Sequence, residues 1–274
     1  MAEAVLRPDP TGYPRTLESL PPQVLQEGSY RVRYARCAEE LDAVLRLRFE
    51  VFNRELGEGL ASSWESGRDE DEFDPFCHHL MVEHLGSGEV IGTYRIQTAE
   101  MAAAGRGFYS ATEFDLASLP AEVVAEAVEV GRACIHRDHR LRPVLFLLWK
   151  GLALYMSHAR KRYLFGPCSL TSQDPWEGRR ALDRLRREGR MHPAIEVGAV
   201  PGFECRWEGE PPADPPADRP GGEIELPPLF DMYLRYAGKV CGPPVIDRRF
   251  GTIDFLVLLD LQDLSPRARR MFFG

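Results

Sequence analysis

The stretch at residues 127–151 constrains the fold more than any other part of this sequence, because it joins a strand pattern, a basic turn and a helix pattern. Residues 127–135 form a short apolar run that contains Glu129 and Arg132. Pro143 then begins a long segment with apolar residues at helical spacing, and proline is favoured at the first position of a helix. The order predicts a buried strand, a turn, and a helix that begins beside the end of that strand.

The turn in this stretch is a basic elbow, which consists of His136, Arg137, His139, Arg140 and Arg142. Backbone N–H groups at the start of a helix attract anions, and arginines beside them strengthen the attraction. A carboxylate in the strand, followed by such a cationic turn, suits acyl transfer from a phosphate-bearing carrier. The sequence therefore predicts an anion site at the elbow.

Glu129 and Arg132 each place a charge in an apolar strand, where an unpaired charge is costly. Strict alternation points the two side chains to opposite faces of the sheet, whereas a bulge between them brings them to the same face. The sequence leaves both arrangements open.

Composition excludes several classes of protein. The 274 residues suffice for one large domain or two small ones, and the net charge of −8 argues against nucleic acid as a partner. Six cysteines without a CxxC pair favour reduced thiols over a disulfide framework or a zinc site, so no metal is predicted. The polar, proline-bearing first 28 residues lack an apolar signal segment, which favours a cytoplasmic protein.

Apolar periodicity predicts an α/β (α+β) fold in which helices flank a largely antiparallel central sheet. A Gly-Ser-Gly-Glu turn at residues 86–89 predicts a hairpin between two of the strands. The expected strands are residues 30–36, 80–85, 90–97, 127–135, 162–168 and 254–260. The expected helices are residues 38–56, 143–158, 175–188, 227–236 and 266–273.

Domain organisation follows from the same patterns. Residues 1–29 show no clear periodicity and are expected to form a flexible N-terminal extension. Residues 30–274 are expected to form a single domain. Within it, residues 211–222 contain a tandem PPAD repeat, which disfavours helix and strand and predicts an exposed loop.

Four further charged residues outside the stretch at 127–151 are candidates for a site. Arg48 lies in an expected helix, Arg95 in an expected strand, and Asp71 and Asp74 in an acidic cluster. They would serve either as substrate contacts or as a salt-bridge network that ties the N-terminal helix to the sheet. The two roles are compatible, and the sequence does not choose between them.

A set of short motifs gives the sequence its most specific likeness. They are RFEVF (48–52), DEFD (71–74), CHHL (77–80), GTYR (92–95), GFYS (107–110), EFD (113–115), EVGR (129–132), LWKG (148–151) and YLR (233–235), followed by Asp247, Phe250 and Asp254. Together they resemble the GNAT-superfamily N-acyltransferases of the ornithine-lipid synthase or hemolysin-like type, which are related to the acyl-homoserine lactone synthases. The resemblance covers roughly residues 30–273 and implies a GNAT-like fold for that domain.

The resemblance also implies an activity. A long-chain acyl group, with a 3-hydroxyacyl group as a variant, would pass from acyl carrier protein to the amino group of an amino acid such as ornithine. The amine would attack the thioester directly, which requires a base and dipoles aimed at the thioester oxygen. No tightly bound cofactor is implied, because acyl carrier protein or acyl coenzyme A serves as co-substrate through its phosphopantetheine thioester.

The implied site residues fall into three groups. Glu129 is the expected base, and Asp71 and Asp74 complete the catalytic group by holding the acceptor's ammonium. The expected substrate-binding residues are Arg48, Phe52, Arg95 and Arg132. The expected binding residues for the carrier's phosphopantetheine are Cys134, Ile135, His136, Arg137, Arg140 and Arg142, with backbone N–H groups at residues 134–136 as oxyanion donors. Arg179, Arg180 and Arg187 are expected to extend the docking face of Arg140 and Arg142 for an acidic carrier protein.

Three departures from the family pattern bear on the substrates. Arg140 occupies the glycine position of the pyrophosphate loop, which favours acyl carrier protein over free coenzyme A. Asp231 stands where a lysine is common, and residues 170–173 lack the family's glycine, so both positions are interpreted as places where the acceptor is read.

Two other functions compete with this one. The first is a small-molecule acetyltransferase that uses acetyl coenzyme A. The second is a non-catalytic lipid-surface protein, for which the basic and aromatic residues 267–273 would rest on anionic lipid. For the enzyme itself, peripheral contact with the inner membrane remains an open alternative to a purely cytoplasmic location.

Overall fold

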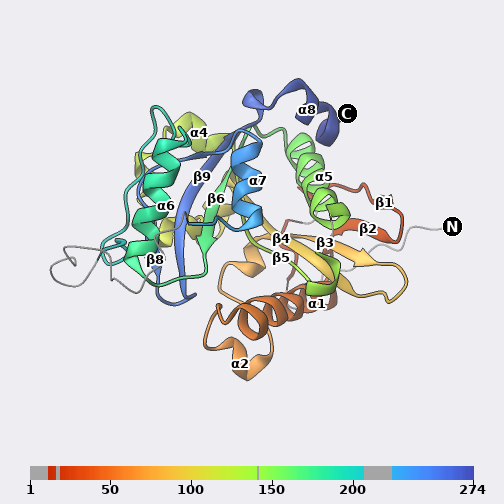
Figure 1. Cartoon of the computed structure of the whole chain (residues 1–274). Helices are drawn as coiled ribbons and strands as arrows, with labels where there is room; N and C mark the ends of the chain where they lie inside the picture. The colour runs from red at the N-terminus through yellow and green to blue at the C-terminus, as the bar shows by residue number, and fades with distance from the viewer. Residues whose placement is uncertain (1–11, 17–18, 141, 207–223) are drawn as a thin grey trace.

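A central sheet with helices on both sides organises the chain (Figure 1), and the computed structural model describes residues 12–16, 19–140, 142–206 and 224–274. In these residues the sheet has nine strands in the order β1-β2-β3-β4-β5-β6-β9-β7, and β8 also pairs with β9. The strands are β1 (Leu25–Glu27), β2 (Tyr30–Tyr34), β3 (His78–His84), β4 (Val90–Thr98), β5 (Ala127–Ile135), β6 (Tyr163–Leu170), β7 (Lys239–Val240), β8 (Val245–Asp247) and β9 (Thr252–Asp260). All pairs are antiparallel except β5 with β6, which confirms the predicted largely antiparallel sheet.

Helices cover the two faces of this sheet. They are α1 (Ala38–Phe49), α2 (Ser63–Ser66), α3 (Ala99–Ala104), α4 (Ala121–Ala125), α5 (Arg142–Ala159), α6 (Pro175–Arg187), α7 (Pro228–Arg235) and α8 (Pro266–Phe273). Leu80 and Val82 of β3 pack with α5, and Met81 between them packs with Val44 of α1. Because successive strand residues face opposite sides, α5 and α1 lie on opposite faces. In Figure 1, α7 and α8 lie next to α5.

A glycine sets the close approach of α5 to the sheet. A Cβ atom at Gly151 would lie 2.7 Å from a methyl group of Leu80, and the Tyr34 hydroxyl donates a hydrogen bond to the Gly151 carbonyl (2.8 Å). The LWKG motif therefore has a packing reason, because a larger residue would push the helix away from β2 and β3.

The helix expected at residues 38–56 changes its geometry halfway. It is α-helical as far as Phe49 and continues as a π-helix, η2 (Glu50–Leu56), which ends at Gly57 in the left-handed region (φ 69°). π-helical turns are rare and often mark functional sites. Here the turn carries Val51 and Phe52, which line the cavity described below.

The N-terminal segment differs from the expected flexible extension. Leu25–Glu27 form the edge strand β1 on β2, and Tyr13 and Leu20 are buried. The prediction was therefore wrong for these residues, because an edge strand of three residues is too short to show periodicity. Residues 1–11 and the proline-rich loop expected at 211–222 lie outside the described part of the chain.

The strands β5 and β6 form a fork. They pair in parallel over Ala127–Glu129 and Tyr163–Phe165, and from there β6 continues to pair only with β9 on its other side. At the parting point a Cβ atom on Gly166 would lie 2.0 Å from the Val130 carbonyl oxygen, so only glycine fits. The fork leaves one edge of each strand unpaired.

No helix of the described residues is long and apolar enough to cross a lipid bilayer. The strongly apolar segment in α5 instead packs against β2, β3 and β4, as its pattern predicted.

Candidate active site

A cavity of about 440 Å³ lies in the fork between β5 and β6. Residues 130–135 of β5 line one side, and residues 167–169 of β6 line the other. Its apolar walls include Val51, Phe52, Leu56, Tyr94, Leu145, Leu148, Leu229, Phe230, Tyr233 and Phe250. Its polar lining includes Glu58, Arg95, Gln97, Tyr109, Glu129, Arg132, Arg140, Ser169, Thr171 and Asp254. An apolar wall with a small set of polar groups is typical of a site that binds an amphipathic ligand.

A bulge in β5 shapes the cavity wall. Arg95 pairs with Gly131 and Thr93 pairs with Cys134, so β5 has one residue more than β4 in this interval. Arg132 lies in the bulge with a positive φ of 48°. The bulge cancels the alternation between Glu129 and Arg132, and both side chains line the cavity.

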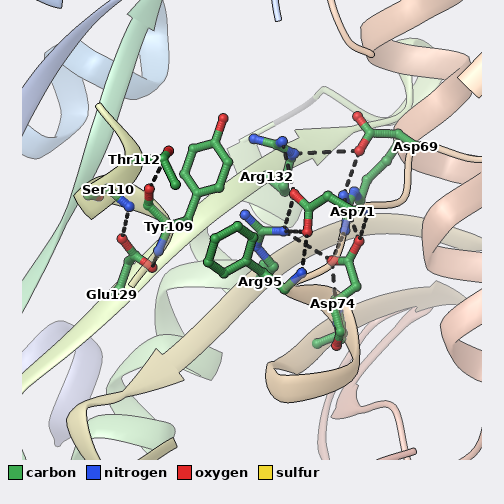
Figure 2. Close-up of polar contacts among 12 residues, drawn as sticks. Asp69, Asp71, Asp74, Arg95, Tyr109, Ser110, Thr112, Glu129 and Arg132 are labelled. Carbon is green, nitrogen blue, oxygen red and sulfur yellow. Dashed lines mark hydrogen bonds and ion pairs between the residues drawn. The ribbon is translucent and has the colours of Figure 1, made fainter. Parts of the chain in front are cut away.

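Glu129 is held by the loop that follows α3. The backbone N–H groups of Tyr109 and Ser110 donate to its two carboxylate oxygens at 2.8 and 2.7 Å (Figure 2). Its side chain is buried, and this burial raises the pKa of the carboxyl although both hydrogen bonds act to lower it. The carboxylate is thus fixed in orientation and easier to protonate than an exposed glutamate.

A buried ion network lies beside Glu129 (Figure 2). Arg48 donates to Asp74 (2.7 Å) and Asp69 (2.5 Å), with none of its side chain exposed. Arg95 donates to Asp71 (2.7 Å) and to Asp74 (3.2 Å). Arg132 contacts Asp71 (3.1 Å) and Asp69 (3.5 Å). Three arginines balance three aspartates, so the predicted salt-bridge network between α1 and the sheet is confirmed.

This network fixes the charge of its members. Burial by itself would raise the pKa of Asp71, but Arg95 and then Arg132 hold it below its ordinary value. Burial lowers the pKa of His79 to about 4, so this residue, which lies 3.8 Å from Asp74, is neutral at pH 7. Asp71 and Asp74 therefore stay ionised and paired.

Tyr109 connects the network to Glu129. Figure 2 shows its ring between Glu129 and Arg132, and the Arg132 guanidinium lies 4.6 Å from the ring centroid. The Phe250 ring also packs against Arg132, with the guanidinium 4.3 Å from the ring centroid. These aromatic contacts hold the arginine at the cavity wall. In the sequence, Tyr109 stands out only as part of the GFYS motif, and no role was predicted for it.

The structure separates the predicted site residues into two groups. Phe52, Arg95, Glu129, Arg132, Cys134, Ile135 and Arg140 line the cavity. Arg48, Asp71 and Asp74 lie behind Arg95 and Arg132, where they contact these arginines or each other. The network thus supports the cavity wall, and a direct contact of Asp71 or Asp74 with an acceptor remains a prediction.

The basic elbow is partly neutralised. Both terminal nitrogens of Arg140 donate to Glu55 (2.6 and 2.8 Å), and Arg137 lies 4.0 Å from the same carboxylate with a largely exposed side chain. The His136 N–H donates to the Ile91 carbonyl (2.8 Å). The expectation that this N–H is a free oxyanion donor was therefore wrong, because β4 uses it. The Arg142 side chain lies outside what the structure describes.

Three carboxylates meet next to the cavity. Glu113, Asp247 and Asp254 come from separate segments, and their carboxylate oxygens lie within 4.8 Å of one another. All three side chains are buried, and Asp254 lines the cavity. No role was predicted for these three residues, although Asp254 is a charge in an apolar strand, which is the signal that singled out Glu129.

The bulged strand β5 and Glu129 lie in a segment that belongs to the GNAT acetyltransferase class. Residues 47–150 match the family model described as an acetyltransferase (GNAT) domain. The chain is 32% identical to the L-ornithine Nα-acyltransferase of Rhodobacter capsulatus over 89% of this chain and 95% of that protein. It is 31% identical to the L-ornithine Nα-acyltransferase of Agrobacterium fabrum over 90% of this chain and 86% of that protein. The chain therefore belongs to the same N-acyltransferase family as these two enzymes.

Among solved structures, the acyl-homoserine lactone synthase LasI is similar with a TM-score of 0.48 and 12% identity, over 90% of this chain and 96% of that one. The N-acyl amino acid synthase FeeM from uncultured soil microbes is similar with a TM-score of 0.46 and 11% identity, over 88% of this chain and 97% of that one.

Proposed function

We propose that this enzyme transfers a long acyl chain from a phosphopantetheine thioester to the α-amino group of ornithine. The observation that carries the proposal is the cavity in the fork, which has apolar walls and a polar lining that includes Glu129 and Arg132. The names of its relatives in Rhodobacter capsulatus and Agrobacterium fabrum support ornithine as the acceptor.

The donor would enter along β5. Beyond Glu129 the edge of β5 that faces β6 is unpaired, and residues 130–135 line the cavity. A phosphopantetheine arm carries amide groups that can pair with such an edge, as a peptide does when it extends a sheet. Acyl carrier protein is the proposed carrier, because Arg140 replaces the glycine at which a pyrophosphate would approach and the side chain of Arg137 is available to a phosphate.

The acceptor's α-carboxylate would bind Arg132. This arginine lines the cavity, and its position is fixed by Tyr109 and Phe250. Of the other two arginines predicted to bind substrate, Arg48 is fully buried against Asp69 and Asp74, and Arg95 pairs with Asp71 and Asp74. The departures from the family pattern at Asp231 and residues 170–173 do not argue against ornithine as the acceptor. Asp231 is 45% exposed and pairs with Arg235, whereas Gln173 donates to the backbone carbonyls of Asp247 and Thr252.

In the proposed reaction, the α-amine nitrogen attacks the thioester carbonyl carbon, an N–C bond forms, and the C–S bond breaks. Glu129 accepts the amine proton, directly or through a water molecule, and the proton then passes to the leaving thiolate. A raised carboxyl pKa makes Glu129 a better base near neutral pH. Burial raises the pKa of Cys134 and Cys168, which disfavours a thiolate nucleophile and supports direct transfer.

The experiment is to incubate the purified enzyme with long-chain acyl carrier protein, long-chain acyl coenzyme A or acetyl coenzyme A and a set of amino acids, and to identify products by mass spectrometry. The expected product is Nα-acylornithine with the long chain. Products formed only from acetyl coenzyme A would favour the acetyltransferase alternative instead.

The remaining alternative, a lipid-surface protein, loses its main feature. Phe272 of α8 is 7% exposed and packs against Trp149 and Tyr236, so it does not present an aromatic surface to lipid. We propose that the enzyme is cytoplasmic and contacts the inner membrane peripherally when the lipophilic product leaves.

A further inference from the structure

The carboxylate cluster of Glu113, Asp247 and Asp254 has no role in the transfer step described above. Its three side chains are 1%, 3% and 3% exposed. Burying three carboxylates within 4.8 Å of one another is unfavourable unless a proton or a cation compensates their charge.

The hydrogen bonds show which oxygens of the cluster are free. Both oxygens of Asp247 have partners: its Oδ1 accepts from the N–H groups of Arg249 and Phe250, and its Oδ2 accepts from the Tyr109 hydroxyl (3.0 Å). Asp254 accepts at Oδ2 from the Thr252 hydroxyl (3.1 Å). Within the described residues, Asp254 Oδ1 and both oxygens of Glu113 have no partner in hydrogen-bonding geometry.

A second observation points to a polar ligand in the same cavity. Gln97 lines the same cavity as Asp254 and is 1% exposed, and neither its amide oxygen nor its amide nitrogen has a partner among the described residues. An unsatisfied buried amide is costly. A polar group of a bound ligand would remove this cost, and a purely apolar acyl chain would not.

We propose that Glu113 and Asp254, supported by Asp247, bind the side-chain ammonium group of the acceptor amino acid and select a diamino acid. This inference rests on the proposed function and names the subsite that distinguishes ornithine from a neutral amino acid. An ammonium group has three N–H donors and no acceptor, which matches the free oxygens of the cluster.

The placement of the cluster fits this substrate. Tyr109 donates through its backbone N–H to Glu129 and through its hydroxyl to Asp247, and its ring contacts Arg132. The Tyr109 side chain therefore lies between the carboxylate cluster on one side and Glu129 and Arg132 on the other. Ornithine likewise has a methylene chain between its α-carbon and its side-chain ammonium.

The raised pKa values of the cluster support the binding of one positively charged group. Burial raises the pKa of Asp254 to about 6, and the charge of Asp247 acts in the same direction. Burial, followed by the charge of Asp254, also raises the pKa of Glu113. These raised pKa values favour a proton within the cluster, and an ammonium group that replaces it would restore the ionised carboxylates.

The test compares ornithine with norleucine, its neutral analogue of similar size, as acceptors. For the wild type, kcat/KM should favour ornithine, and Asp254→Asn and Glu113→Gln should each lower the ornithine-to-norleucine ratio by about tenfold or more. Asp183→Asn is the matched control, because this carboxylate is 57% exposed on α6, and its ratio should equal that of the wild type. Circular dichroism verifies that each variant is folded.

A second measurement uses the wild type alone. Near pH 6, calorimetric titration in two buffers should show that ornithine releases more protons on binding than norleucine does. If the wild type acylates ornithine but both variants keep its ratio and no extra proton is released, the subsite inference is overturned while the proposed function stands. If EDTA abolishes activity and a divalent cation restores it, the cluster is a metal site and the inference is also overturned. A wild type that acylates only neutral amino acids overturns the proposed acceptor itself.

Discussion

Glu129 combines three properties that a catalytic base needs: it lines the cavity, it is fixed by two backbone N–H groups, and burial raises its pKa. Glu129→Gln keeps the side-chain shape and removes the base. We expect kcat to fall about 10²–10⁴-fold, the range for general-base catalysis, with the fold retained. Glu126→Gln, which changes an exposed carboxylate three positions earlier in the chain, is the control and should keep full activity. Turnover of Glu129→Gln within about threefold of the wild type would contradict the assignment.

The same residue predicts a pH profile. A base must be deprotonated to act, so kcat/KM should rise as the pH passes upward through the pKa of Glu129. Because burial raises this pKa, the acid limb of the profile should lie at higher pH than an ordinary glutamate would give. The limb should be absent from the residual activity of Glu129→Gln, and a limb that is the same in both enzymes would point to another group.

At the scale of elements, the ion network joins α1 to β4 and β5. Arg48→Met leaves Asp69 and Asp74 buried without their shared counter-charge. We expect the free energy of unfolding to fall by about 3–5 kcal/mol, as measured by urea denaturation. Arg46→Met on the same helix is the control. Arg46 pairs with Asp42 at the surface and its side chain is 57% exposed, so its loss should cost less than about 1 kcal/mol. Equal effects of the two substitutions would show that burial does not matter here.

The fork between β5 and β6 also depends on one position. In Gly166→Ala the new methyl group would meet the Val130 carbonyl oxygen at 2.0 Å, so the two strands must move apart. We expect a loss of stability of about 1–3 kcal/mol and a lower acyl-transfer rate, because β5 carries Glu129 and the bulge. Gly198→Ala, where a Cβ atom meets nothing within 4 Å, should change neither thermal stability nor activity.

At the scale of the whole molecule, carrier docking should centre on the basic elbow. In Figure 1, α6 with Arg179 and Arg180 is separated from the start of α5 by β6 and α7. The elbow instead adjoins the cavity through Arg140. We therefore expect Arg137→Glu to raise the KM for acyl carrier protein severalfold, and Arg179→Glu to leave it unchanged.

Salt provides an independent check on docking, because it screens charges that lie apart in solvent. The KM of the wild type for acyl carrier protein should increase with ionic strength, whereas the KM for the amino acid should change less. If Arg137→Glu and salt both leave the carrier's KM unchanged, the docking face lies elsewhere.

Local patterns were sufficient for most of the elements. The strand predicted at residues 127–135 is β5, and the helix predicted from Pro143 is α5 with one further residue at each end. Alternation and helical spacing involve neighbours in sequence, so they can be read without knowing the fold. The short strands β7 and β8 were missed, because they exist only through their pairing with β9.

The charges of the site show what local patterns cannot decide. The sequence identified Glu129 and Arg132 as charges in an apolar strand, and the bulge that puts them on one face appeared only with the register of β4 and β5. Glu113, Asp247 and Asp254 meet only after β8 and β9 pair and the loop before α4 folds onto them. The sequence by itself determined most of the strands and helices and which residues are charged. The tertiary structure decided which charges neutralise one another, because electrostatic compensation depends on distance in space and on burial, and neither follows from separation along the chain.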